Sequence, residues 1–473
     1  MTLRPLHTTP RPRDDRWVGA TGRTLQVVIV VYMLVILAFV WTTKELAFAS
    51  LRSDPIFAGY SLAVVCYILG RFFLSLAYRP VRRGNRRPTV SVIVPAFNEE
   101  AGIAGTLRSC LSARYPHASL EVIAINDGST DRTWDRILEV KRDHPELYAV
   151  HLGGNYGKRA AMAEGIRRAR GEILLFVDSD SYLARDAVEE IVKPFEDRRV
   201  GAVVGHADVA NDMTNWLTKM QQVRYYSAFR VIKGTESLLS GAVTCASGCC
   251  SAYRRDVLLT FLDEWEHQVF LGRPATFGDD RALTNRVLQG HRVVYQSTAR
   301  STTHVPESLS RFLRQQLRWK KSWLRESLQV VRYFWRKNPL AALLTYASIL
   351  FPFLAPFVVT RAVLNGFDGG GNRLWFYLIG TYAMALLYSL YYALTRRTGL
   401  WYHGMTFVAI YMSVLVFQTY WGIATMRDTR WGTRDSTVEH RSVDRRRMIV
   451  HPPSLPWTTS PAEQPAVVTV AGS

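Results

Sequence analysis

The residues of this chain best suited to chemistry are acidic side chains that follow apolar, β-branched runs. Asp127 ends one such run, and Asp178 and Asp180 end another. Similar runs alternate with helical patterns between residues 88 and 305, which predicts a mostly parallel sheet whose strands end at one edge. Three carboxylates at that edge would repel one another unless a cation lay among them, and oxygen ligands favour Mg²⁺ or Mn²⁺. Exposed acids at strand ends also occur without any such role.

Two further acids, Asp279 and Asp280, begin a predicted helix and are followed by Arg281. Acids at this position often do no more than cap a helix and interact with its dipole. The alternative is that one of them is a general base that removes a proton from an attacking hydroxyl, while Arg281 fixes its geometry. The segment therefore predicts either a helix cap or a catalytic base.

Lys158 lies in the glycine-containing segment 153–165, at the start of another predicted helix. A helix N-terminus with a lysine suits a diphosphate or a nucleotide. The segment lacks the Gly-x-x-x-x-Gly-Lys-Ser/Thr spacing of a P-loop, so by itself it also fits an ordinary helix start.

A basic stretch after the predicted sheet places Gln315, Arg318 and Trp319 at positions i, i+3 and i+4, on one face of a helix. Its apolar side chains could anchor in a membrane surface while its arginines and lysines contact lipid headgroups. A helix that only lies on a membrane has no need of the glutamine. We therefore expect a membrane-surface helix with an additional binding role.

Apolar segments flank the predicted sheet domain on both sides. Residues 25–41 and 56–78 precede it, and residues 340–364, 374–395 and 405–425 follow it. Their lengths are close to that of a bilayer span, and arginines outside the first pair predict that both of its ends face the cytoplasm. The net charge of +20 fits membrane-flanking arginines and also an anionic substrate. No nucleic-acid motif accompanies this charge, so we expect a multi-pass membrane protein and no nucleic-acid partner.

The cysteines argue against two classes of site. There are five, Cys66, Cys110, Cys245, Cys249 and Cys250, and none has paired Cys-x-x-Cys spacing. This pattern disfavours a zinc site or a disulfide framework and favours reduced thiols.

Four short motifs occur in a fixed order: DG at 127–128, DSD at 178–180, GDD at 278–280 and QQLRW at 315–319. This set, ending at the membrane, resembles the signature of processive family-2 glycosyltransferases, the group of cellulose, chitin and hyaluronan synthases. FLGRPATFGDDRALTN, YQSTAR and QQLRWKKSWLRES, with WGTRD at 431–435, resemble hyaluronan synthases of the bacterial type. The resemblance covers residues 25–435. It implies an α/β fold of the GT-A type, with a mostly parallel sheet domain embedded between transmembrane and interfacial helices.

The resemblance also implies roles for individual residues. Asp280 would be the base, with Arg281 beside it, and Asp180 would bind Mg²⁺ or Mn²⁺. The residues expected on the UDP-sugar donor are Pro95, Asn98, Glu99, Asp127, Lys158, Asp178, Gln315, Arg318, Trp431 and Arg434. Those expected on the acceptor are Trp319, Cys245, Ser247 and Gly248. The implied substrates are UDP-glucuronate (UDP-GlcUA) and UDP-N-acetylglucosamine (UDP-GlcNAc), with the nascent polysaccharide and membrane lipids as partners; the oligomeric state stays open, and a monomer could suffice.

One residue departs from the family pattern, because Cys249 follows Ser247 and Gly248 where proline is usual. The departure bears on acceptor or product specificity, although a small buried thiol can also fill a proline-sized space. The nearest alternative function is a chitin-like or poly-GlcNAc synthase that uses UDP-GlcNAc alone. A lipid-linked transferase that adds one sugar and a catalytically dead membrane scaffold or channel are further alternatives; the intact acids argue against the scaffold.

These features predict seven segments along the chain. They are a cytoplasmic N-terminal segment (1–24), two transmembrane helices (25–78), a cytoplasmic catalytic domain (88–305), amphipathic interfacial helices (306–337), transmembrane helices plus one interfacial or re-entrant segment (338–428), a WGTR gating loop (429–435) and a disordered tail (436–473). We choose 405–425 as the re-entrant segment, since Trp431 and Arg434 must reach a cytoplasmic active site. The predicted location is the cell membrane.

Overall fold

The computed structural model of the chain describes residues 54–367, 371–396, 398–428 and 443–454, and single positions between 24 and 38. The predicted segments 1–24, apart from Thr24, and 429–435, with Trp431 and Arg434, and most of 25–41 and 436–473, lie outside the described residues. The chain forms two compact units. The sheet unit comprises residues 80–206, 245–303 and 436 onward, and the helical unit comprises residues up to 79, 207–244 and 304–435.

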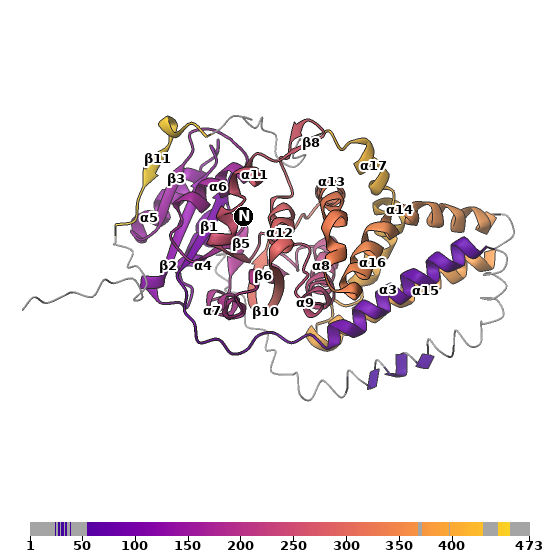
Figure 1. The fold of residues 1–473 in the computed structure, drawn as a ribbon. Coiled ribbons are helices and arrows are strands. Elements are labelled where there is room, and N and C mark those ends of the chain that lie inside the picture. The colour runs from indigo at the N-terminus through magenta and orange to yellow at the C-terminus, as the bar shows by residue number, and fades with distance from the viewer. Residues whose placement is uncertain are drawn as a thin grey trace, which may run out of the picture. The chain divides into compact units, whose positions relative to one another are not determined.

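The sheet unit is built on a mixed sheet whose central strands are parallel (Figure 1). In the described residues, nine strands pair in the order β11-β3-β2-β1-β4-β7-β6-β10-β5. They are β1 (Val90–Ala96), β2 (Leu120–Asn126), β3 (Tyr148–His151), β4 (Ile173–Phe176), β5 (Ser181–Leu183), β6 (Val200–Val209), β7 (Ser251–Arg254), β10 (Arg292–Thr303) and β11 (Ile449–His451). β1 pairs in parallel with β2 and β4, and β2 pairs in parallel with β3. β7 runs antiparallel to β4 and β6.

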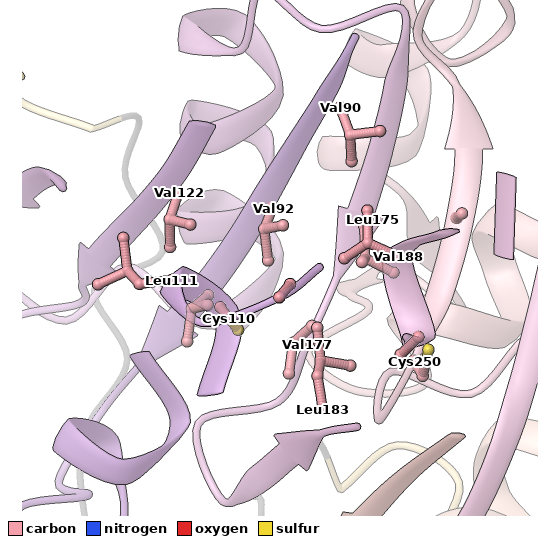
Figure 2. Packing of buried hydrophobic residues seen from close by; sticks show 14 of the residues in the cluster. Val90, Val92, Cys110, Leu111, Val122, Leu175, Val177, Leu183, Val188 and Cys250 are labelled. Carbon is pink, nitrogen blue, oxygen red and sulfur yellow. The ribbon is translucent and has the colours of Figure 1, made fainter. Parts of the chain in front are cut away.

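Helices cover both faces of this sheet. The side chains of each strand alternate between the two faces, and both sets are apolar, so both faces must be buried. The helices are α4 (Ile103–Leu111), α5 (Thr133–Asp143), α6 (Lys158–Arg168), α7 (Ala187–Val192), α10 (Arg255–Leu259), α11 (Leu262–Glu266) and α12 (Asp279–Gly290), and a small hairpin is formed by β8 (Val269–Phe270) and β9 (Arg273–Pro274). Figure 2 shows Val92 of β1 in one buried cluster with Cys110 of α4. Ile93 faces the other side, where α6 carries Gly165; a Cβ at Gly165 would lie 2.5 Å from Ile93 Cγ2. The glycine thus lets α6 pack closely on the sheet.

The helical unit contains the candidate membrane spans. Its helices are α3 (Pro55–Leu76), α8 (Trp216–Ser227), α9 (Gly234–Leu238), α13 (Leu309–Tyr333), α14 (Pro339–Phe367), α15 (Gly371–Arg396), α16 (His403–Ile410) and α17 (Gln418–Ala424). In the described residues, Pro55–Leu76, Pro339–Leu364 and Tyr377–Arg396 are long and apolar enough to cross a membrane. A fourth candidate, His403–Leu415 with Gln418–Ala424, is bent by 42° at its break.

The C-terminal residues differ from the expectation of a disordered tail. Strand β11 pairs antiparallel with β3, with Ile449 opposite His151 and His451 opposite Ala149. The physical reason is that β3 would otherwise expose unpaired backbone groups, and Ile449 and Val450 are β-branched residues that favour a strand. At residues 449–451 the prediction of disorder is therefore wrong.

Candidate active site

A pocket lies in the sheet unit, beyond the carboxyl ends of β1 and β4. Pro95 and Asp178, at or just after the ends of these strands, line it, together with Lys158 of α6, Gly248 and Asp280. Residues that are far apart in the sequence therefore meet where ligands of parallel α/β sheets commonly bind.

Lys158 and Asp178 form an ion pair in this pocket. Burial alone would lower the pKa of the Lys158 ammonium, but Asp178, with Asp279 and Asp280, raises this pKa above its ordinary value. Lys158 is therefore protonated at neutral pH. Gly248 permits the position of the carboxylate, because a Cβ at Gly248 would lie 2.7 Å from Asp178 Oδ1. The backbone N–H of Asp178 also donates to the Gly248 carbonyl at 3.0 Å.

Asp280 has two carboxylate oxygens in different environments. Oδ1 accepts the backbone N–H of Arg281 at 2.8 Å. Oδ2 lies 3.8 Å from the Cys245 thiol, which is a weak donor. The adjoining segment is held to the same helix, since the Ala246 N–H donates to Thr284 Oγ1 at 2.9 Å. Of the two Asp280 oxygens, Oδ2 therefore has the weaker hydrogen bond.

The neighbouring Asp279 is buried in an ion pair with Arg159. Arg159 Nε donates to Asp279 Oδ1 at 2.9 Å, and the side chains are 5% and 4% exposed. Arg159 Nη1 also donates to the Trp265 carbonyl at 2.8 Å and to Gln268 Oε1 at 2.9 Å. Arg159 thus fixes the acid beside Asp280, and Arg281 donates its backbone N–H to Asp280 itself. The role expected of the Arg281 side chain stays a prediction.

Sequence reasoning missed Arg159, although a signal was present. Lys158 and Arg159 are consecutive cations in the first turn of α6, where the helix dipole disfavours positive charge. Each is offset by an acid, Asp178 for the first and Asp279 for the second. Two adjacent cations at a helix N-terminus therefore indicated two acidic partners elsewhere in the chain.

Asp127 lies apart from these contacts. It is 2% exposed, and its Oδ1 accepts the Tyr156 N–H at 2.8 Å. Asn98, which has a positive φ of 52°, accepts the Thr130 N–H at 2.9 Å, and the Glu99 N–H donates to Thr133 Oγ1 at 2.7 Å. These contacts tie the loop after β1 to the loop after β2.

The predicted cluster of three carboxylates around a cation is not formed. Among the described residues, no group of three or more His, Cys, Asp or Glu side chains could hold a metal ion. Asp127 is turned to a backbone N–H, Lys158 neutralises Asp178, and Asp180 Oδ1 accepts the Thr303 hydroxyl at 3.4 Å. Mg²⁺ in nucleotide sites is usually held by one or two carboxylates plus substrate phosphates. Asp180 with Asp178 fits this smaller donor set.

Gln315, Arg318 and Trp319 belong to α13 of the helical unit. Trp319 is 38% exposed, and its ring centroid lies 6.5 Å from that of Tyr225. The Gln315 Oε1 atom is buried and, among the described residues, has no hydrogen-bond partner. Burying an amide oxygen without a hydrogen-bond partner costs free energy. A ligand hydroxyl or a water that donates to this oxygen would remove that cost.

Comparison with known proteins places the chain in a family. Residues 91–262 match the model of glycosyl transferase family 2. A hyaluronan synthase from Streptococcus pyogenes is 32% identical over 410 residues, which cover 85% of this chain and 97% of that protein. An N-acetylglucosaminyltransferase from Azorhizobium caulinodans is 32% identical over 74% of this chain and 88% of that protein.

A solved mannosyltransferase from Pyrobaculum calidifontis, in complex with GDP-Man and Mn²⁺, covers 76% of this chain and 99% of its own with a TM-score of 0.55. At 21% identity this likeness concerns the fold, which is of the GT-A type. The family match and the identity over nearly the whole length of the bacterial synthase lead to the same assignment. The chain is therefore a membrane protein that belongs to the processive family-2 glycosyltransferases and resembles the bacterial hyaluronan synthases.

Proposed function

We propose that this glycosyltransferase polymerises UDP-GlcUA and UDP-GlcNAc into hyaluronan and moves the polymer across the membrane. The observation that carries the proposal is the pocket in which Asp280 and the Lys158–Asp178 pair meet, in a chain that aligns with 97% of a hyaluronan synthase. The pocket supplies an acid for proton transfer and a cation for a diphosphate within one site.

The donor side of the site is built from the ends of β1, β2 and β4. Asp127 contacts the uridine, with Pro95, Asn98 and Glu99 along the same edge. Lys158, at the N-terminus of α6, exchanges its contact with Asp178 for a contact with the diphosphate, which the helix dipole also favours. Asp180 and Asp178 would hold Mg²⁺ or Mn²⁺, which would neutralise negative charge on the UDP leaving group.

Asp280 is the general base. Its Oδ1 is held by the Arg281 N–H, so Oδ2 takes the proton of the acceptor hydroxyl. The hydroxyl oxygen forms a bond to the anomeric carbon as the bond from that carbon to the diphosphate oxygen breaks, and UDP leaves with the electron pair. Attack from the face opposite UDP converts an α-linked donor into a β-linkage.

Each unit carries residues that we propose for the acceptor. Cys245, Ser247 and Gly248 precede β7 in the sheet unit and approach the acceptor sugar. In α13, Trp319 stacks on the acceptor while Gln315 and Arg318 hold the acceptor and the diphosphate. The exposed face of Trp319 and the unsatisfied oxygen of Gln315 support these roles. The expected closure of Trp431 and Arg434 over the substrate concerns residues outside the described ranges and stays a prediction.

We further propose four membrane spans in the cell membrane, with the catalytic domain in the cytoplasm. Two spans precede the catalytic domain, and α14 and α15 follow it. The 42° break between His403–Leu415 and Gln418–Ala424 supports a re-entrant or interfacial segment at this point rather than a straight span. The polymer leaves between the spans, in contact with membrane lipids.

A synthase that uses UDP-GlcNAc alone is the second candidate. It is favoured by the similarity to an N-acetylglucosaminyltransferase over 74% of the chain. Cys249, which stands where hyaluronan and chitin synthases usually carry proline, bears on the same choice of acceptor or product.

The test is to measure UDP release by the purified protein in lipid with Mg²⁺ or Mn²⁺. Each UDP-sugar is supplied alone, and then both are supplied together. The proposal expects strong synergy between UDP-GlcUA and UDP-GlcNAc and a high-mass product that hyaluronidase digests. Full turnover with UDP-GlcNAc alone favours the second candidate instead. The matched control is Asp280→Asn, which should lower UDP release by at least about a hundredfold under each of these conditions.

A further inference from the structure

Residues 443–454, here called the C-terminal clasp, attach to the sheet unit at three places. Asp444 N–H donates to the Tyr156 hydroxyl at 3.3 Å at the start of the clasp. Strand β11 pairs with β3 in the middle. At the end, the Ser454 N–H donates to the Pro145 carbonyl at 3.0 Å, and Lys141 Nζ donates to the Pro452 carbonyl at 2.8 Å. The clasp is therefore held along its whole length.

The first attachment reaches the loop between β3 and α6, which leads directly into Lys158. Gly153 of this loop has a φ of +74°, and a Cβ there would lie 2.5 Å from the Arg447 carbonyl oxygen. The turn at Arg445–Arg447 thus packs directly on the loop backbone.

Two chains of hydrogen bonds connect the clasp with the donor edge of the sheet. Tyr156 contacts Asp444 through its hydroxyl and Asp127 through its backbone N–H, at 2.8 Å. In the second chain, His151 pairs with Ile449 of β11, and its Nδ1 accepts the Asn126 amide at 2.5 Å. Burial lowers the pKa of His151, which favours the neutral imidazole that this contact requires.

The second chain continues to the loop after β1. Asn126 Oδ1 accepts the Ser129 hydroxyl at 2.5 Å, and Ser129 Oγ accepts the Asn98 N–H at 3.0 Å. Both chains therefore end at residues of the donor edge, Asp127 in one and Asn98 in the other. Trp134 adds a packing contact, since its ring lies 5.2 Å from His151 and 5.8 Å from His451.

We propose that the C-terminal clasp positions the donor-binding edge for the nucleoside diphosphate, with Tyr156 as the positioning residue that joins the clasp to Asp127. The inference rests on the proposed function, because it takes UDP as the ligand of this edge. A loop held in its binding geometry before the ligand arrives loses less conformational freedom on binding, so affinity rises. The clasp thus acts on UDP affinity without contacting the reacting atoms.

The experiment measures the dissociation constant of UDP by calorimetry for the full-length protein and for three variants in lipid. Deletion of residues 443–473 should weaken UDP binding about tenfold because the loop is no longer pre-ordered. Tyr156→Phe removes one hydrogen bond and should weaken binding about threefold. Deletion of residues 455–473, which keeps the clasp, should leave the constant unchanged.

A rescue separates positioning from loss of fold. A synthetic peptide of residues 443–454, added to the protein that lacks 443–473, should restore UDP affinity, and a peptide with Val450→Pro should not. Tyr148→Phe is the matched control for Tyr156→Phe, because the Tyr148 hydroxyl contacts Arg168 rather than the clasp. Equal UDP affinity of the full-length protein and the Tyr156→Phe variant would overturn the inference. Absence of UDP binding by the full-length protein would instead overturn the proposed function.

Discussion

Buried ion pairs occur in both units, but in different surroundings. In the sheet unit, Arg159 and Asp279 lie at the first turns of α6 and α12, next to the residues that line the pocket. In the helical unit, Arg71 of α3 pairs with Glu236 of α9 at 2.8 Å, with side chains 6% and 10% exposed. Arg71 lies within a candidate membrane span, where an unpaired charge would be especially costly.

The apolar side chains show the opposite distribution. The strands of the sheet unit bury residues such as Val92 and Ile93 completely, whereas Leu343, Phe357 and Trp375 of the helical unit are more than 60% exposed. A surface of this kind suits lipid rather than water. Similar ion pairs thus occur in different settings: one joins the first turns of α6 and α12 beside the pocket, and the other joins α3 and α9 in an apolar environment.

The largest effect should follow from removing the base. Asp280→Asn should lower UDP release by about 10²- to 10⁴-fold, because the amide cannot accept the proton of the acceptor hydroxyl. Thermal unfolding should be unchanged, since the Arg281 N–H can still donate to the amide oxygen. Turnover at the rate of the unchanged protein would remove Asp280 from the role of base.

Arg159→Gln tests the ion pair of the sheet unit. We expect turnover to fall up to about a hundredfold, because a shift in the start of α12 misplaces Asp280. The free energy of unfolding should also fall, by about 3–5 kcal/mol, since Asp279 would be left buried without its partner. The double variant Arg159→Gln with Asp279→Asn removes the unpaired charge and should recover part of both losses. A double variant no better than Arg159→Gln would show that the pair is not the cause.

Arg71→Met tests the ion pair of the helical unit, and its effect should be confined to stability. Removing one partner of a buried ion pair lowers the free energy of unfolding by about 3–5 kcal/mol. The dissociation constant of UDP should stay within about twofold of its original value, because the donor edge belongs to the sheet unit. Thermal unfolding in lipid and calorimetry with UDP measure the two quantities. A large loss of UDP affinity in folded protein would contradict the distinction between the two pairs.

The smallest effect concerns Lys320 of α13, whose pKa is lowered to about 8 by burial and by the charge of Arg224. The unfolded chain has a lysine pKa of about 10.4, so between pH 8 and that value the unfolded state binds more protons. Stability should therefore rise with pH across this window. Thermal unfolding of the protein relative to Lys320→Met between pH 8 and 10 measures the difference. A relative fall in stability over that range would contradict the assignment.

The central strands could be predicted from the sequence, because continuous β-branched runs are typical of strands buried on both faces. The runs at 89–100, 120–127, 148–152 and 172–180 correspond to β1, β2, β3 and β4. Strand β11 could not be predicted, since its three residues are too few to establish a period and its formation depends on the exposed edge of β3. Short strands are specified by their partners more than by their own residues.

The candidate site was predictable in its residue types but not in its pairings. The acids and Lys158 stand in motifs, whereas the direction of each side chain depends on contacts between distant segments. Asp127 turns to Tyr156, and Asp279 turns to Arg159. Neither pairing leaves a periodic pattern in the sequence, so the three-carboxylate arrangement was wrong even though its residues lie at the strand ends.

The position of β11 has a consequence for the order in which the protein is made. The ribosome produces β3 about three hundred residues before its neighbour at 449–451, after all of the candidate membrane spans among the described residues. Until then the outer edge of β3 has no strand beside it, and such an edge invites pairing with other chains. The catalytic sheet is thus finished only after the membrane helices have been synthesised. A segment of twelve residues, 443–454, thus links completion of the sheet to synthesis of the candidate membrane spans.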